Sequence, residues 1–245
     1  MAPSEPTTSA GVLLAFLKPT SAGGNEAQPD DKLALLSTAI IGNVLGIKSA
    51  TQYKAANSEY DKQHLFVCET EDLARVNVKQ MLKFLDGENV GGEWDVRAYS
   101  EVQIFGPKKT GGMSARCTLT KDGDERRQSL TFNVVEPTTT IMIALMQPSP
   151  TGAEDLDAWY REEHNQQTSE QPAWLRTCRY ALVSQESGSS DEGGKKQELS
   201  FLAIHEFGEG EQLGDTVKAF EPISEWTMKV MKDAVGIDAA IYRRK

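Results

Sequence analysis

The sequence DLDAWYREEH, residues 155–164, contains side chains that could move protons and side chains that could hold an aromatic molecule. One face of an α-helix with this sequence would carry, at positions i, i+3, i+4, i+7 and i+8, Leu156, Trp159, Tyr160, Glu163 and His164. A neutral imidazole has a pKa near ~6.5, so it can accept and return a proton near neutral pH without a cofactor. The spacing predicts an amphipathic helix that packs on a sheet and ends in a candidate acid or base.

Two interpretations of His164 are open. It is a base or a hydrogen-bond donor at the mouth of a cavity, or it is a helix-end histidine that contacts solvent and interacts favourably with the helix dipole. Glu163 lies about 100° around the helix from His164, so the spacing does not require a direct pair. Under the first interpretation, Trp159, Tyr160 and Glu163 are predicted substrate contacts.

His205 is the second candidate for acid–base chemistry. It lies in the apolar run LSFLAIHE, residues 199–206, which predicts a buried strand. Alternation along a strand places His205 on the same face as Phe201, and Leu202 and Ile204 on the other. If Leu202 and Ile204 pack under helices, His205 and Phe201 point into the space between two sheets. The alternative is a hydrogen-bonded histidine in the core.

Arg176 and Tyr180 alternate with Cys178 on one face of the strand predicted at 174–183. An arginine and a tyrosine on one face could orient a phenol or a carboxylate. The other interpretation is ordinary packing with a charge at the rim. Arg176 and Tyr180 are therefore included among the predicted substrate contacts.

Composition limits the partners. Thirty-six acidic and 26 basic residues give a net charge of −10, which repels phosphate backbones and anionic lipids. No apolar run approaches the ~20 residues of a membrane span, and the N-terminal sequence does not have the pattern of a secretory signal. The cysteines, Cys68, Cys117 and Cys178, lack metal-ligand spacing, which favours reduced thiols. We expect a cytoplasmic protein that binds a small molecule rather than nucleic acid or a membrane.

The motifs of several cofactor-dependent classes are absent from the sequence. It contains no GxGxxG, P-loop, HExxH or GxSxG pattern, so nucleotide, zinc-protease and serine-hydrolase chemistries lose support. The three histidines fall on different predicted elements, which makes a dedicated metal site improbable. No cofactor is expected.

The chain repeats one pattern of elements. An apolar run that ends at proline, hydroxyl residues and glycine occurs at 13–23 and again at 142–152. The elements that follow each run have the same order: a helix (32–41 and 158–164), two strands (46–53 with 64–69, and 174–183 with 199–206), a longer helix (71–85 and 211–234) and a last strand (94–99 and 237–242). Asp30 or Asp31 can cap the first helix, and Asp155 or Asp157 its counterpart.

Each half is therefore expected to fold as βαββαβ, the ferredoxin-like order, with both helices on one face of an antiparallel sheet. The strands are apolar at consecutive positions, so both sheet faces should be covered. Tandem repeats then face each other as an intramolecular, pseudo-dimeric α+β barrel. The expected divisions are a polar tail (1–10), a first half (11–106), a linker with an extra β-hairpin (107–138) and a second half (139–245).

The sequences DLDAWYREEH, PAWLRTCRYALV and LSFLAIHEF resemble the EthD-like branch of the dimeric α+β barrel superfamily, especially fungal proteins with two tandem units. The resemblance covers residues 139–243, whereas the first-half helix DDKLALLSTAIIG has no Trp-Tyr pair and no Glu-His pair. It implies a cavity enclosed by two ferredoxin-like units and activity without a metal or an organic cofactor. Relatives include decarboxylases, dehydratases, cyclases and cofactor-free monooxygenases.

The leading hypothesis is a cofactor-independent, lyase- or cyclase-like enzyme that acts on an aromatic or polyketide-like substrate in the barrel cavity. His164 is then the main acid or base and His205 a second polar contact. The alternatives are a non-catalytic ligand-binding or scaffold barrel, and a cofactor-free monooxygenase of phenols. The two halves can cover each other's sheets, which favours a monomer with an internal pseudo-dimer, although a homodimer is also compatible.

Overall fold

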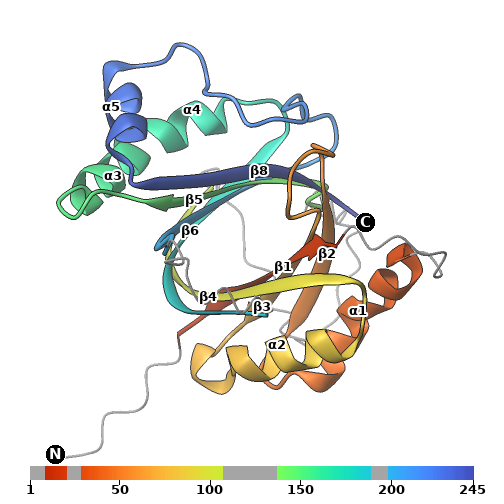
Figure 1. The fold of residues 1–245 in the computed structure, drawn as a ribbon. Helices are drawn as coiled ribbons and strands as arrows, with labels where there is room; N and C mark the ends of the chain where they lie inside the picture. The colour runs from red at the N-terminus through yellow and green to blue at the C-terminus, as the bar shows by residue number, and fades with distance from the viewer. Residues whose placement is uncertain (1–8, 21–28, 107–136, 189–197) are drawn as a thin grey trace, which may run out of the picture.

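The computed structural model describes residues 9–20, 29–106, 137–188 and 198–245 (Figure 1). Most of the predicted N-terminal tail and the whole of the predicted linker hairpin lie outside these ranges. The proposed domain divisions therefore stay predictions.

Both halves have the predicted βαββαβ order. The first half contains β1 (Gly11–Pro19), α1 (Pro29–Asn43), β2 (Ser49–Ala55), β3 (His64–Thr70), the 3-10 turn η1 (Leu73–Arg75), α2 (Val78–Gly87) and β4 (Gly92–Phe105). The second half contains β5 (Thr140–Gln147), α3 (Ala153–Trp159), the π-helical segment η2 (Tyr160–His164), α4 (Asn165–Ser169), β6 (Trp174–Ser187), β7 (Phe201–Phe207), α5 (Glu225–Asp233) and β8 (Gly236–Arg244).

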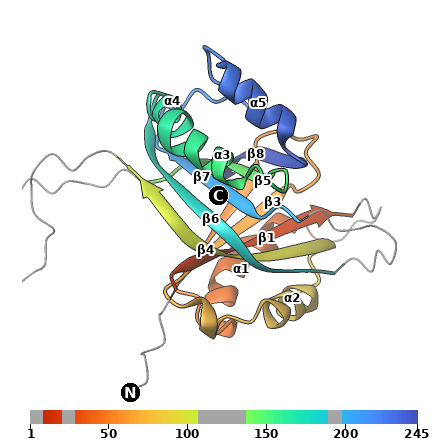
Figure 2. The same cartoon turned by 90° about the vertical axis from the view of Figure 1, so that its left-hand side faces the viewer.

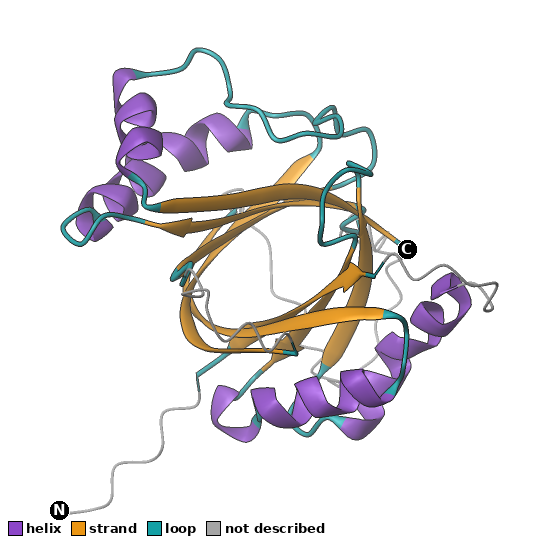
Figure 3. Ribbon diagram, viewed as in Figure 1, coloured by secondary structure: helices purple, strands orange, loops and turns teal. Residues whose placement is uncertain are grey.

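The strands form a closed barrel in the order β1-β3-β2-β8-β5-β7-β6-β4, with every neighbouring pair antiparallel. Within each half this is the ferredoxin-like strand order. Helices α1 and α2 lie on one side of the ring of strands, and α3, α4 and α5 lie on the opposite side (Figures 1 and 3). The structure confirms the predicted tandem α+β barrel.

Strand β1 shows why the sequences of the strands are continuous apolar runs. Leu13 and Leu17 pack in the layer under α1 and α2, whereas Leu14 and Phe16 pack inside the barrel. Both sets are buried, so strict alternation of apolar and polar residues is not expected. The inner face of the second half is also apolar, with Ile141, Ile143, Leu145, Leu202 and Ile204 in the barrel cluster.

The two halves meet along two unequal seams. Strands β4 and β6 are paired from Asp95 opposite Ser187 to Phe105 opposite Thr177, with two shifts of register. Strands β2 and β8 are joined by three residue pairs only. The long seam, in which β4 and β6 run side by side, is visible in Figure 2.

Two predicted helices differ from the structure. The helix predicted at 71–85 is divided into η1 and α2, because Asn77 accepts a hydrogen bond from the Gln80 N–H (3.0 Å) and so caps α2. The helix predicted at 211–234 is wrong over most of its length, since only α5 is helical. Pro222 has no N–H to donate, and Ser224 caps α5 through the Thr227 N–H (2.9 Å).

Among the helices of the described ranges, none has both the length and the apolar character that crossing a membrane requires.

Candidate active site

His205 points toward the helices of the second half and not into the barrel. Leu202 and Ile204 belong to the cluster inside the barrel, and Phe201 and Ala203 pack in the layer under α3 and α5. The prediction that His205 and Phe201 face the space between the sheets is therefore wrong. Both faces of β7 are buried, so the sequence pattern could not tell which face the helices cover.

A π-helical turn places His164 beside His205. The N–H of Asn165 bonds to the carbonyl of Tyr160, five residues earlier, so η2 is wider than an α-helical turn. The rings of Trp159 and His164, also five residues apart, stack with centroids 4.2 Å apart and an interplanar angle of 21°. In an α-helix these positions would be about 140° apart, so the π turn brings the rings together.

The histidine cluster consists of five rings, those of Trp159, Tyr160, His164, His205 and Phe220. The ring centroid of His164 lies 5.3 Å from that of His205, 5.2 Å from that of Tyr160 and 6.0 Å from that of Phe220. His205 is fully buried, whereas His164 and Phe220 are partly exposed. His164 is therefore the more accessible of the two histidines.

Thr177 of β6 is the hydrogen-bond partner of His205. The Thr177 hydroxyl accepts a hydrogen bond from Trp174 Nε1 (3.2 Å) and lies 2.9 Å from His205 Nδ1. In the tautomer in which Thr177 donates to Nδ1, neutral His205 carries its hydrogen on Nε2. Among the described residues, Nε2 has no hydrogen-bond partner. In that tautomer the cluster contains a buried N–H donor next to the ring of His164.

Both histidines are neutral at physiological pH. Burial lowers the pKa of His164 to about 4, with a smaller decrease from Arg179 and an opposing increase from Glu163. The pKa of His205 is lowered well below its ordinary value, first by burial and second by the neighbouring His164. A neutral imidazole is a proton acceptor, so His164 is available as a base.

The free energy of unfolding should fall as the solution is acidified, because His164 binds a proton in the unfolded chain near pH ~6.5 but in the folded chain only near pH 4. Linkage gives a loss of roughly 2 kcal/mol from this residue between pH 7 and pH 5. Urea denaturation at both pH values measures it. The His164→Phe chain should lose less stability over this interval, and an equal loss in both chains would contradict the assignment.

Glu163 holds α5 against η2. Its Oε1 accepts hydrogen bonds from Trp159 Nε1 (3.1 Å), Ser224 Oγ (2.6 Å) and Thr227 Oγ1 (2.7 Å). Burial raises the pKa of Glu163, but these bonds outweigh it and the net pKa is lowered. Of the predicted contacts on this helix, Trp159, Tyr160 and His164 come together, while Glu163 orients the helix beside them.

Arg176 and Tyr180 lie on the other face of β6 from the histidine cluster. Arg176 forms an ion pair with Glu206 (2.8 Å), and Tyr180 packs against the cluster inside the barrel. The face toward the helices carries Thr177 and Arg179 instead, which the sequence analysis missed. No sequence signal separates the two faces of this strand.

Arg179 connects the histidine cluster to a cavity beside α3. Its guanidinium lies over the Tyr160 ring, 4.5 Å from the centroid, and its Nη1 is 2.7 Å from Asp157 Oδ1. Arg179 also lines a cavity of about 450 Å³, together with the predicted residues Tyr180 and Phe201. Arg179 and Tyr160 therefore stand between this cavity and His164.

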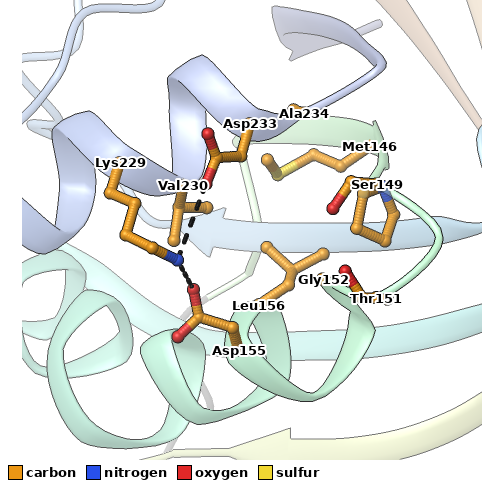
Figure 4. Close-up of a pocket in the computed structure, with 11 residues that line it drawn as sticks. Met146, Ser149, Thr151, Gly152, Asp155, Leu156, Lys229, Val230, Asp233 and Ala234 are labelled. Carbon is orange, nitrogen blue, oxygen red and sulfur yellow. Dashed lines mark hydrogen bonds and ion pairs between the residues drawn. The ribbon is translucent and has the colours of Figure 1, made fainter.

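A smaller cavity of about 120 Å³ lies between α3 and α5 (Figure 4). Lys229 of α5 bridges two carboxylates at its edge, 2.5 Å from Asp155 Oδ2 and 3.6 Å from Asp233 Oδ2. Asp155 therefore ties α3 to α5 and does not cap α3, which begins after Gly152 without a side-chain cap. Exposed pairs of this kind contribute about 0–1 kcal/mol each.

Two further observations distinguish the second half. Asn165, next to His164, is fully buried, and neither atom of its amide has a partner among the described residues. In the first half, Cys68 pairs with Leu13 as His205 pairs with Met142, and Cys68 lies in an apolar layer under α1 and α2. At this position of the repeat, the second half thus has an imidazole where the first half has a thiol.

The parts of the chain that the structure describes contain no group of three histidine, cysteine, aspartate or glutamate side chains placed to hold a metal ion.

The barrel and its two helix layers place the chain in the class of α+β barrel proteins. An anthrone oxidase-like protein superposes with a TM-score of 0.56 and 12% identity, over 97% of this chain and 92% of that chain. A variant of the chlorite dismutase from Candidatus Nitrospira defluvii, in complex with cyanide, superposes with a TM-score of 0.51 and 9% identity, over 98% of this chain and 92% of that chain. No protein-family model and no curated protein sequence matches the chain. At these identities the likeness shows a shared fold.

Proposed function

We propose that the protein is an enzyme that acts on a small aromatic or polyketide-like molecule by acid–base chemistry in the helix layer of its second half. The observation that carries the proposal is the fully buried, unpartnered Nε2 of His205 beside the partly exposed ring of His164. A buried donor without a partner costs about 1–3 kcal/mol, so it is retained more readily where a ligand accepts from it.

The two histidines have different roles in this proposal. Neutral His164 removes a proton from carbon or oxygen of the substrate, and the Nε2–H of His205 donates to the oxygen on which negative charge develops. That charge would stabilise the imidazolium that forms at His164. Enolisation of a carbonyl compound needs these two groups. The enolate is an intermediate of dehydration and cyclisation, and decarboxylation forms the same intermediate by loss of carbon dioxide. No cofactor takes part in this proposal.

The aromatic rings support the proposed substrate class. Trp159, Tyr160 and Phe220 surround His164, and they leave its ring in apolar surroundings where an aromatic molecule can stack. The cavity lined by Tyr180 and Phe201 adjoins the cluster through Arg179, whose guanidinium lies over the Tyr160 ring. We place the substrate between sheet and helices rather than in the barrel interior, which apolar side chains occupy.

The filled interior also favours the second candidate function, a barrel that binds ligands without catalysis. A phenol monooxygenase is a third candidate, and oxygen consumption with a quinol or an anthrone would distinguish it from both.

The experiment that tests the proposal is deuterium incorporation at the carbon next to the carbonyl of 1-tetralone, followed by NMR in heavy water. The wild-type chain should accelerate the exchange over buffer, and the His205→Leu chain should be slower because the carbonyl loses its buried donor. Tetralone that binds, as followed by its line broadening, but exchanges at the buffer rate would support the non-catalytic candidate.

A further inference from the structure

A third cavity, which we call the barrel-mouth cavity, lies at one end of the barrel, away from the histidine cluster. It has a volume of about 440 Å³ and is built by both halves. Its lining includes Phe16 of β1, Lys62 of the β2–β3 loop, Arg97 of β4, Leu199 before β7 and Asp238 of β8.

Arg97 presents an unused donor in this cavity. Its side chain is 6% exposed, and Asp95 accepts from Nε (3.1 Å) and from Nη2 (2.6 Å). Burial alone would lower the pKa of Arg97, but the bonds to Asp95 raise it, so the guanidinium stays charged. The third nitrogen, Nη1, is buried and has no partner among the described residues. A hydrogen-bond acceptor from a ligand would satisfy it.

The other charges near Arg97 are already balanced. Asp238 forms an ion pair with Lys62 and accepts a hydrogen bond from Tyr60 Oη (2.6 Å). Lys62 Nζ and Arg97 Cζ both lie over the Phe16 ring, 5.0 and 5.8 Å from its centroid. The cavity is already lined by four carboxylates and three cations, so an added carboxylate would meet net repulsion. An uncharged acceptor does not meet this repulsion.

We propose that the barrel-mouth cavity binds an uncharged small molecule with a carbonyl oxygen. The carbonyl accepts a hydrogen bond from Nη1 of Arg97, and the apolar part of the molecule lies against Phe16 and Leu199. The site lies at the end of the barrel, on the opposite face of the strands from His205, so it does not depend on the proposed function.

The test is an NMR titration of the full chain with three probes of similar shape: acetophenone, ethylbenzene and benzoate. Acetophenone should shift the resonances of residues 94–97. Ethylbenzene, which has no acceptor, should bind about tenfold or more weakly. Benzoate should also bind more weakly than acetophenone. The proposal is overturned if ethylbenzene binds as well as acetophenone, if benzoate binds more tightly, or if acetophenone does not bind.

Two matched variants identify the donor. Arg97→Lys keeps a positive charge beside Asp95 but removes the planar fork, so it should lose the preference for acetophenone over ethylbenzene. Arg243→Lys makes the same change at an arginine of β8 that is paired with Glu211 and Asp215 and does not line the cavity; it should keep the preference. A folded Arg97→Lys chain with an unchanged preference would overturn the proposal. If that chain does not fold, the wild-type comparison of the three probes decides.

Discussion

The His164→Phe chain is expected to exchange the tetralone protons about 10²–10⁴ times more slowly than the wild type, the range typical for loss of a positioned acid or base. Phenylalanine keeps an aromatic ring stacked on Trp159, 4.2 Å away in the wild type, but it has no nitrogen that can accept a proton. The rate at saturating tetralone isolates the chemical step from binding.

His64→Phe is the matched control for this change, since it replaces another buried histidine in the first half. It should leave the exchange rate near that of the wild type, provided that thermal unfolding shows a folded chain. A His164→Phe chain that exchanges protons at the wild-type rate would remove His164 from the proposed mechanism.

Replacing Trp159 by alanine is expected to reduce the free energy of unfolding by about 3–5 kcal/mol, the usual range for a buried tryptophan. The side chain is 1% exposed and stacks on His164. Its Nε1 donates to Glu163 and to Thr227, so its loss also loosens α5. The cavity that forms should admit water beside His164, and the pKa of His164 should rise from about 4 toward its ordinary value.

Urea denaturation and an NMR pH titration of the histidine rings measure these two effects. Trp94→Ala provides the comparison, because Trp94 is equally buried in the first half, at 2% exposure. It should lower the stability by a similar amount and leave the pKa of His164 unchanged. A pKa that moves in both variants, or in neither, would show that Trp159 does not set the environment of His164.

The sequence was sufficient to predict the barrel. The repeated order of elements places each apolar run in the same position of a ferredoxin-like unit, and the register bears this out, since Leu13 is opposite Cys68 as Met142 is opposite His205. Burial of both strand faces followed from the absence of alternation. The order of elements and the apolar runs depend on many residues together, so no single residue decides the prediction.

The orientation of the site was not predictable in the same way. Alternate residues of β6 and β7 face opposite sides of the sheet, and His205 and Arg179 are on the side that the helices cover. Because both sides of these strands are buried, the sequence does not show which set of residues faces the helices. The stack of Trp159 on His164 depends on a π turn, whereas the sequence analysis assumed an α-helical period of 3.6 residues. The sequence therefore did not reveal that His164 and His205 lie together under the helices of the second half.

The tandem arrangement of the two halves within one chain has an energetic consequence. In a barrel of two identical chains, symmetry would place an unsatisfied imidazole under both helix layers, and the stability penalty of about 1–3 kcal/mol would apply twice. Here Cys68 occupies the matching position in an apolar layer, so the penalty applies once. A single chain can thus confine an unsatisfied imidazole at this strand position to one of its two halves.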